Sequence, residues 1–232
     1  MGRVLNLALA LLKWPLALLA VALWPVVLTE VRDNASLLAL QPDRVWPFVT
    51  GAGVWLLAWF AVFRRSAWGS WLPTLLHEVA HALAAWLTLH RVIGLRASWR
   101  SGGEIEIVGA GNWFIALAPY WLPLPLGAVA VASLWTGPDQ AAAVAAALGS
   151  GIAWQATVLG REIHRDQDDL QRAGWLFSAC VLPIANAVVA ALALAWAALG
   201  PGAAADTLIG VGRGAEVVAI QAVDALRSAL PW

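Results

Sequence analysis

The chain has 232 residues, of which 61% are hydrophobic and 12% charged, and its formal net charge is zero. Soluble globular domains have about 25% charged residues, so this composition predicts an integral membrane protein. Without net positive charge or a basic tract, the sequence gives no support to a nucleic-acid partner. The single cysteine, Cys180, excludes an intrachain disulfide, and its apolar neighbours indicate a packed side chain.

Two membrane spans are predicted in the first part of the chain. The apolar run at the start is longer than that of a cleaved signal peptide, so we expect a retained span at about 14–29 with an interfacial segment before it. A polar link at 30–44 follows and carries five charges. The second span, 45–63, has nineteen residues without a charge, which is about enough to cross the hydrocarbon core.

The third predicted span, 68–89, contains the pattern H-E-x-x-H as His77, Glu78 and His81. Residues four apart lie about one helical turn apart, so both imidazoles can reach one point. This spacing is typical of zinc hydrolases, in which two histidines bind the metal and the glutamate takes a proton from the metal-bound water. The alternative is structural: the histidines bond a neighbouring helix and Glu78 is paired. Ionisable residues inside a span mark a functional site by default.

A β-hairpin is predicted directly after this helix, at about 91–108. Apolar and polar residues alternate on both sides of Ser101-Gly102-Gly103, which is the period of a strand with turn residues between two runs. An irregular amphipathic loop is the alternative.

The rest of the chain predicts three more spans and a polar tail. The fourth span contains Pro119, Pro123 and Pro125, so it should kink or break, and it is expected to line the cavity of the site. Gly149 and Gly151 in the fifth indicate close helix packing. The tail should form an amphipathic surface helix. The fourth, fifth and sixth spans are expected at 113–135, 141–159 and 173–199, and the tail helix is expected at 206–230. The predicted fold is therefore one all-α polytopic membrane domain over 1–232, with about six transmembrane helices.

The stretch Leu76-His77-Glu78-Val79-Ala80-His81-Ala82-Leu83-Ala84-Ala85, with the hairpin after it, resembles the site-2 protease family of intramembrane zinc metalloproteases. It is most similar to the small bacterial members. The resemblance implies a Zn²⁺ ion on His77, His81 and a later carboxylate, with Glu78 as the base. It also implies a bacterial inner-membrane location and a substrate that is a membrane protein segment cut within or near the bilayer.

The third metal ligand is the open point of this resemblance, because the family's usual late aspartate motif is absent. The best substitute is Asp169, in Asp168-Asp169-Leu170-Gln171-Arg172-Ala173-Gly174, with Asp168, Asp166 and His164 as alternatives. An aspartate before a helix can also simply cap it. In a crossing helix, His81 would lie about 12 Å in from Leu89 at 1.5 Å per residue, so the loop would have to dip inward.

Further hypotheses concern the site's surroundings and the membrane topology. Tyr120 could donate to the oxyanion, although lining the cavity is favoured, and Asn186 should bond one helix to another. Counting Lys and Arg gives eight on the side of the hairpin and the 161–172 loop, and six on the other. This predicts a cytoplasmic hairpin with both termini outside. The functional alternatives are a non-catalytic client-binding relative and a transporter with a buried proton relay.

Overall fold

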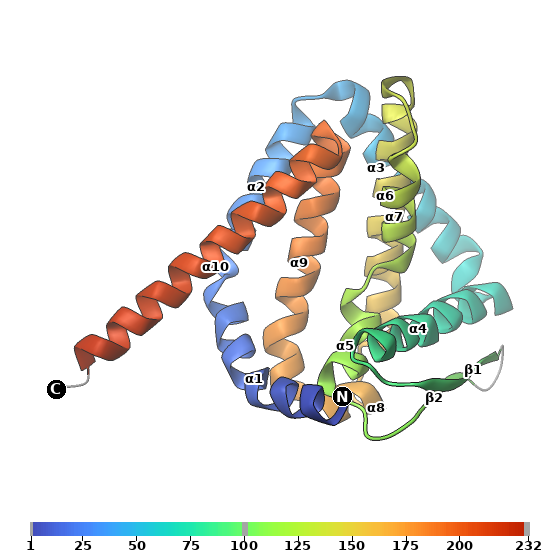
Figure 1. The fold of residues 1–232 in the computed structure, drawn as a ribbon. Helices are drawn as coiled ribbons and strands as arrows, with labels where there is room; N and C mark the ends of the chain where they lie inside the picture. Colours follow the sequence, from blue (N-terminus) through green and yellow to red (C-terminus); the bar gives the residue numbers. More distant parts are fainter. Residues whose placement is uncertain (1, 99–101, 230–232) are drawn as a thin grey trace.

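The fold is helical apart from one two-stranded antiparallel sheet among the residues that the computed structural model describes, 2–98 and 102–229 (Figure 1). This confirms the predicted all-α class with a small hairpin. Short 3₁₀ helices lie at Phe63–Arg65 and Pro138–Gln140. The other elements are α1 (Gly2–Ala22), α2 (Trp24–Ala39), α3 (Pro42–Ala61), α4 (Ala67–Leu87), β1 (Val92–Ser98), β2 (Gly102–Ile107), α5 (Trp113–Trp121), α6 (Leu124–Ser133), α7 (Ala141–Glu162), α8 (Asp168–Ala173), α9 (Trp175–Leu199) and α10 (Pro201–Ala229).

Two levels are visible in Figure 1. The helices α2, α3, α6, α7 and α9 form an upper bundle, which we call the helical bundle. Beneath it lie α4, the β1–β2 hairpin, α5 and α8, which we call the site layer. The first part of α1 runs along this lower level before the chain turns upward.

Small residues allow α3 and α7 to approach closely within the helical bundle. A Cβ on Gly51 would overlap the backbone of Ala146, and one on Gly149 would overlap the Phe48 carbonyl. The Ser150 hydroxyl also donates to the Gly51 carbonyl over 2.9 Å. The predicted packing role of the glycines in α7 is confirmed by these contacts.

Four of the described helices are long and apolar enough to cross a membrane, and the bent α5–α6 pair makes a fifth if it counts as one span. The four are Gly2–Ala22, Pro42–Arg65, Pro138–Glu162 and Trp175–Leu199. They fit an integral membrane protein, as the composition predicts. Two of them contain the predicted spans at 45–63 and 141–159, and Trp175–Leu199 covers the predicted span 173–199 except for its first two residues.

Helix α4 differs from the crossing helix predicted at 68–89. It has 21 residues but is not among the candidate spans, and it runs obliquely across the lower part of the molecule in Figure 1. Two histidines and a glutamate lower the hydropathy of this helix, and ionisable residues are costly inside the hydrocarbon core. The site therefore lies in a helix at the end of the bundle.

The first predicted span, 14–29, straddles a helix boundary in the structure. The helix α1 ends at Ala22 and α2 begins at Trp24, with Pro25 in its first turn, where proline needs no amide partner. The candidate span here is Gly2–Ala22. Most of the predicted polar link belongs to α2, whose buried Asn34 donates to the Thr207 hydroxyl over 3.0 Å.

The start of α1 lies at the same end of the molecule as the hairpin. The Asn6 amide nitrogen donates to the Ala110 carbonyl over 2.8 Å, and the Asn6 amide oxygen accepts from the Asn112 side chain over 2.8 Å. The sequence-based topology placed the N-terminus on the opposite side, and that prediction is wrong. That topology counted α4 as a crossing helix, and α4 is not among the candidate spans.

The predicted break in the fourth span is confirmed as a 65° bend between α5 and α6. Asn186 on α9 holds this bend, because its amide nitrogen donates to the Tyr120 carbonyl over 2.8 Å. Gln155 on α7 donates in turn to the Asn186 amide oxygen over 3.3 Å. Asn186 thus bonds one helix to another, as predicted.

The hairpin lies within the predicted range 91–108. Its strands pair antiparallel, from Val92 opposite Ile107 to Ser98 opposite Gly102, with an irregularity between Val92 and Gly94. Residues 99–101, which include part of the predicted turn, lie outside the described residues.

The predicted tail helix is α10, which begins a few residues earlier than expected. Val211, Ala215 and Val218 pack against the cluster formed by α1, α2 and α9. Beyond these residues the helix extends away from the body in Figure 1, with exposed Ile220 and Val223. Residue 230, at the end of the prediction, lies outside the described residues.

Candidate metal centre

The helix α4 presents its two histidines toward one point. Ser66 caps the helix by accepting from the Gly69 amide over 3.0 Å, which fixes where the helix starts. One turn separates His77 from His81, and their ring centroids lie 4.8 Å apart. His81 is buried, and the His77 side chain is 10% exposed.

Both imidazoles face the carboxylate of Asp169. The Nε2 atoms of His77 and His81 lie 3.3 and 3.2 Å from the same oxygen, Oδ2 of Asp169. One ligand atom from each of the three residues lies within 4.8 Å of the others. The structure therefore brings together the three residues that the sequence analysis named as metal ligands.

The other ring nitrogen of each histidine is hydrogen-bonded outside the cluster, so that Nε2 is the atom that faces Asp169. Nδ1 of His81 donates to the Ile115 carbonyl over 2.8 Å, and Nδ1 of His77 donates to the Glu162 carboxylate over 2.9 Å. Such partners fix the tautomer and the ring orientation of metal-binding histidines. Sequence reasoning missed Glu162, and the only sign of it is its place at the start of the charged stretch 161–172.

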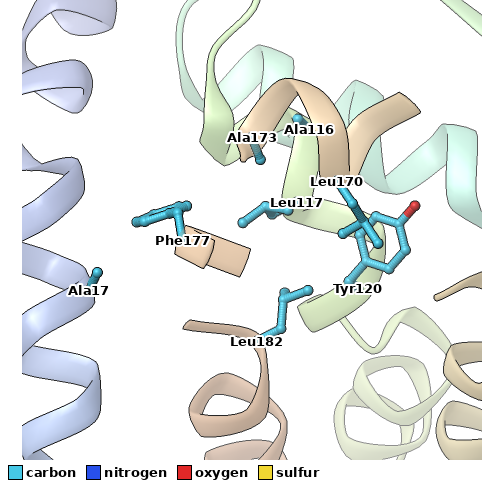
Figure 2. Close-up of a cluster of buried hydrophobic side chains, with 8 residues drawn as sticks. All are labelled: Ala17, Ala116, Leu117, Tyr120, Leu170, Ala173, Phe177 and Leu182. Carbon is cyan, nitrogen blue, oxygen red and sulfur yellow. The ribbon is translucent and has the colours of Figure 1, made fainter. Parts of the chain in front are cut away.

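Asp169 is positioned by the short helix α8. Its neighbours Leu170 and Ala173 are buried in the cluster of Figure 2, together with side chains from α1, α5 and α9. This leaves Asp169 facing α4. Burial would raise the pKa of the Asp169 carboxyl, but its hydrogen bonds to His77 and His81 hold that pKa below its ordinary value.

The alternative ligands lie nearby without joining the cluster. His164, Asp166 and Asp168 line the same cavity but are exposed, and among the described residues only His77, His81 and Asp169 form such a group. The oblique course of α4 also removes the depth objection to Asp169, because α8 reaches the histidines from the same end of the bundle.

Glu78 is buried beside the histidines, with 7% of its surface exposed. It lines a cavity of about 660 Å³ together with His77, His81 and Asp169. A Cβ on Gly103 of β2 would lie 2.8 Å from Cδ of Glu78, so the start of β2 covers this carboxylate. Glu78 is thus close to the cluster without belonging to it.

Tyr120 contacts His77 without lining the cavity of the site. It is fully buried, and its ring lies edge-on to His77 with centroids 5.6 Å apart. Neither large cavity beside the cluster is lined by Tyr120, contrary to the expectation that it lines the site. Other residues of α5, Trp113, Ile115 and Ala116, do line one of them, as predicted for this helix.

The donor atoms suit a zinc ion in number and type, and the two separations between nitrogen and oxygen suit it in spacing. Catalytic zinc is bound by three protein ligands, often imidazole and carboxylate, and keeps one position open. Tetrahedral ligand atoms about 2.0–2.1 Å from the metal lie roughly 3.3 Å apart. The Nε2–Oδ2 separations of 3.3 and 3.2 Å are close to that value.

The fold and this cluster define a polytopic membrane protein with a two-histidine, one-carboxylate centre. The model of the Peptidase M50B-like family matches residues 50–164, and the chain belongs to this family of site-2 proteases. The predicted resemblance is confirmed at that level, while the small bacterial branch stays a prediction. The match covers His77, Glu78 and His81 and ends before Asp169. Neither curated proteins nor solved structures gave a match.

Proposed function

We propose that the chain is an intramembrane zinc-dependent endopeptidase that cuts a transmembrane protein or peptide within or near the bilayer. The observation that carries the proposal is the convergence of His77, His81 and Asp169, with both Nε2 atoms 3.2 to 3.3 Å from one carboxylate oxygen and Glu78 buried beside them. Family membership supports the protease class. The similarity to small bacterial members supports a location in the bacterial inner membrane.

The residues of the site have distinct roles in the proposed reaction. His77, His81 and Asp169 would hold the zinc, which supplies an acidified water and polarises the peptide carbonyl. Glu78 accepts the proton of the attacking water and passes it to the leaving amine. Burial keeps the Glu78 carboxylate away from competing water, and the hydrogen bonds from Nδ1 of each histidine hold the rings in place.

The free edge of β2 offers a place for the substrate backbone. Residues 102–105 line one cavity beside the cluster, Ile105 and Ile107 line the other, and no residue of β1 lines either. The Val108 amide donates to the Arg91 carbonyl. Donors alternate along a strand, so Ile105 and Ile107 direct their amides away from β1. An extended substrate can pair with this edge by β-augmentation.

Two other functions compete with this proposal. A non-catalytic client-binding relative would need neither Glu78 nor a ligand set with zinc spacing. A transporter would use the buried histidines and carboxylates as a proton relay, but their Nε2 atoms converge on one oxygen instead of forming a chain across the bilayer. The presence of Glu78 beside the ligand set and the convergence of the Nε2 atoms on one oxygen both favour the endopeptidase.

Cleavage of a model transmembrane substrate by zinc-loaded protein tests the proposal. Glu78→Gln should abolish cleavage while zinc stays bound, because both imidazoles and Asp169 are untouched. His77→Ala and His81→Ala should lose zinc and activity together. Asp168→Ala, next to the proposed ligand but exposed, is the matched control and should cleave normally. A Glu78→Gln protein that cleaves at the wild-type rate would refute the protease assignment.

Proline substitutions test the substrate edge separately. Ile105→Pro or Ile107→Pro removes an amide that points away from β1, so the hairpin should persist while cleavage of a transmembrane substrate is lost and zinc content is unchanged. Full cleavage by folded, membrane-inserted proline variants would show that the hairpin is only a connector.

A further inference from the structure

Two cavities meet at the proposed zinc ligands. One has a volume of about 630 Å³ and the other about 660 Å³, and both are lined by His81, Ile105, Asp169 and Arg172. A substrate strand along β2 would pass from one into the other, because Ile107 lines the first and residues 102–104 line the second.

The charges of the two cavities are opposite. The larger one, which we call the acidic cavity, has two arginines, Arg161 and Arg172, against six carboxylates in its lining. The smaller one, which we call the basic cavity, has two cations, Lys13 and Arg172, and a single carboxylate, the proposed zinc ligand Asp169. The carboxylates of the acidic cavity are Glu78, Glu104, Glu162, Asp166, Asp168 and Asp169.

Lys13 is an unusual residue at its position within helix α1. It interrupts the apolar helix α1, where a charge is costly unless it has a role. Its ammonium is 5.2 Å from the ring centroid of Phe177 and 5.9 Å from that of Trp14, which holds the side chain at the cavity wall. Among the described residues, neither Lys13 nor Arg172 forms an ion pair with a carboxylate.

We propose that the basic cavity is a substrate subsite that binds a carboxylate of the peptide, either an acidic side chain or a free C-terminus. The proposal rests on the endopeptidase function, since it assigns the segment of substrate next to the proposed zinc. Lys13 and Arg172 would attract the carboxylate, and the acidic cavity would repel it. The charge difference thereby fixes which side of the cut bond carries the acidic group.

The subsite lies close to the scissile bond. Arg172 follows Asp169 by three residues on α8, which places the two side chains on one face about one turn apart. A strand rises about 3.3 Å per residue, so a substrate carboxylate at Arg172 is about two or three residues from the cut bond. An anionic lipid headgroup is the competing ligand, but Ile105, His81 and Asp169 line this cavity and belong to the proposed peptide-cutting site.

Binding to the zinc-loaded Glu78→Gln protein in detergent micelles tests the subsite without requiring cleavage. The probes are matched pairs of dye-labelled alanine–leucine peptides. One pair places Glu or Gln three residues before a central bond, a second places them three residues after it, and a third ends in a free carboxylate or an amide. The carboxylate member of one pair should bind about five-fold more tightly, the size expected of partly exposed ion pairs.

Substitutions at the two cations should remove this preference. Lys13→Gln and Arg172→Gln should each reduce it, whereas Arg165→Gln, an exposed arginine that lines neither cavity, should leave it unchanged. Equal binding within all three pairs, or an equal loss in Arg165→Gln, would overturn the subsite. Loss of the preference on adding phosphatidylglycerol would overturn it in favour of a lipid site.

The subsite and the endopeptidase function can fail independently. If the zinc-loaded wild type cuts none of the peptides although Glu78→Gln protein binds them with the expected preference, the endopeptidase is refuted and the subsite stands. If the wild type cuts both members of every pair with equal kcat/KM and they bind equally, the subsite is refuted and the endopeptidase stands.

Discussion

The helical bundle and the site layer are held together by different interactions. In the bundle, α3 and α7 meet through small residues, and a Cβ on Gly51 or Gly149 would overlap the backbone of the opposite helix. In the site layer, polar side chains bond one element to the next. Arg161 at the end of α7 donates to the Gly69 carbonyl of α4 over 2.9 Å, and His81 donates to Ile115 of α5.

This difference separates the scaffold from the chemistry. Close backbone packing between α3 and α7 gives the bundle rigidity and needs no ionisable groups at the contact. The site layer instead lies at the lower end, where side-chain hydrogen bonds can orient single groups. Substitutions at the close backbone contacts of the bundle should therefore remove the folded protein, and substitutions in the site layer should change zinc binding or cleavage in a folded protein.

The largest effect is expected in the bundle at Gly51. Gly51→Leu should prevent α3 and α7 from docking, because its Cβ would overlap the Ala146 carbonyl, so little folded protein should be recovered. Gly53→Leu on the same helix is the matched control, since a Cβ there has nothing within 4 Å. Monodisperse recovery by size exclusion in detergent measures both. Equal recovery of the two variants would contradict the role given to close packing.

In the site layer, Gly103→Ala should reduce cleavage about 100-fold with zinc content unchanged, because its Cβ would lie 2.8 Å from Cδ of Glu78 and push that carboxylate aside. In Gly94→Ala, the control on β1, the Cβ would meet the Glu106 side chain at 3.3 Å. The measured kcat/KM should be about 100-fold lower in Gly103→Ala than in the control Gly94→Ala. Wild-type cleavage by Gly103→Ala would show that β2 does not constrain Glu78.

Glu162→Ala should weaken zinc binding about 10- to 100-fold, because Nδ1 of His77 loses the carboxylate that orients the ring. Competition with a chelator of known affinity gives the zinc dissociation constant. Asp168→Ala serves again as the control and should bind zinc as the wild type does. An unchanged constant in Glu162→Ala would mean that the packing of His77 alone sets its orientation.

A loss of stability without a direct effect on the metal centre is expected at Asn186, which bridges the two regions. Asn186→Ala leaves the Tyr120 carbonyl at the helix break without its donor, and should lower the free energy of unfolding by about 1–3 kcal/mol. Reversible unfolding in mixed detergent measures this change. An Asn186→Ala protein as stable as the wild type would indicate that water or a rearranged side chain replaces the bond.

The sequence predicted the parts of the site that depend on local geometry. His77, Glu78 and His81 share one helix, so their relative positions follow from helical spacing alone. The glycines of α7 and the prolines between α5 and α6 likewise act through local chemistry. These features needed no knowledge of how distant elements pack.

The parts that the sequence did not predict depend on the placement of whole elements. The oblique course of α4 changed both the topology and the depth of the histidines, and nothing in its own length of 21 residues distinguishes it from a crossing helix. Glu162 reaches His77 only because α7 ends beside α4. Lys13 was visible as a charge in an apolar run, but its cavity is formed by residues from α1, α4, β2, α5 and α8 and the link before α5.

Zinc content after dialysis against a chelator tests the central claim most directly, because it reports the three ligands independently of any substrate. The wild type and Glu78→Gln should each keep about one zinc per chain, as expected for a single catalytic site, while Asp169→Ala should keep none. A wild type without zinc, or an Asp169→Ala protein that retains as much zinc as the wild type, would contradict the assignment of His77, His81 and Asp169 as the metal centre.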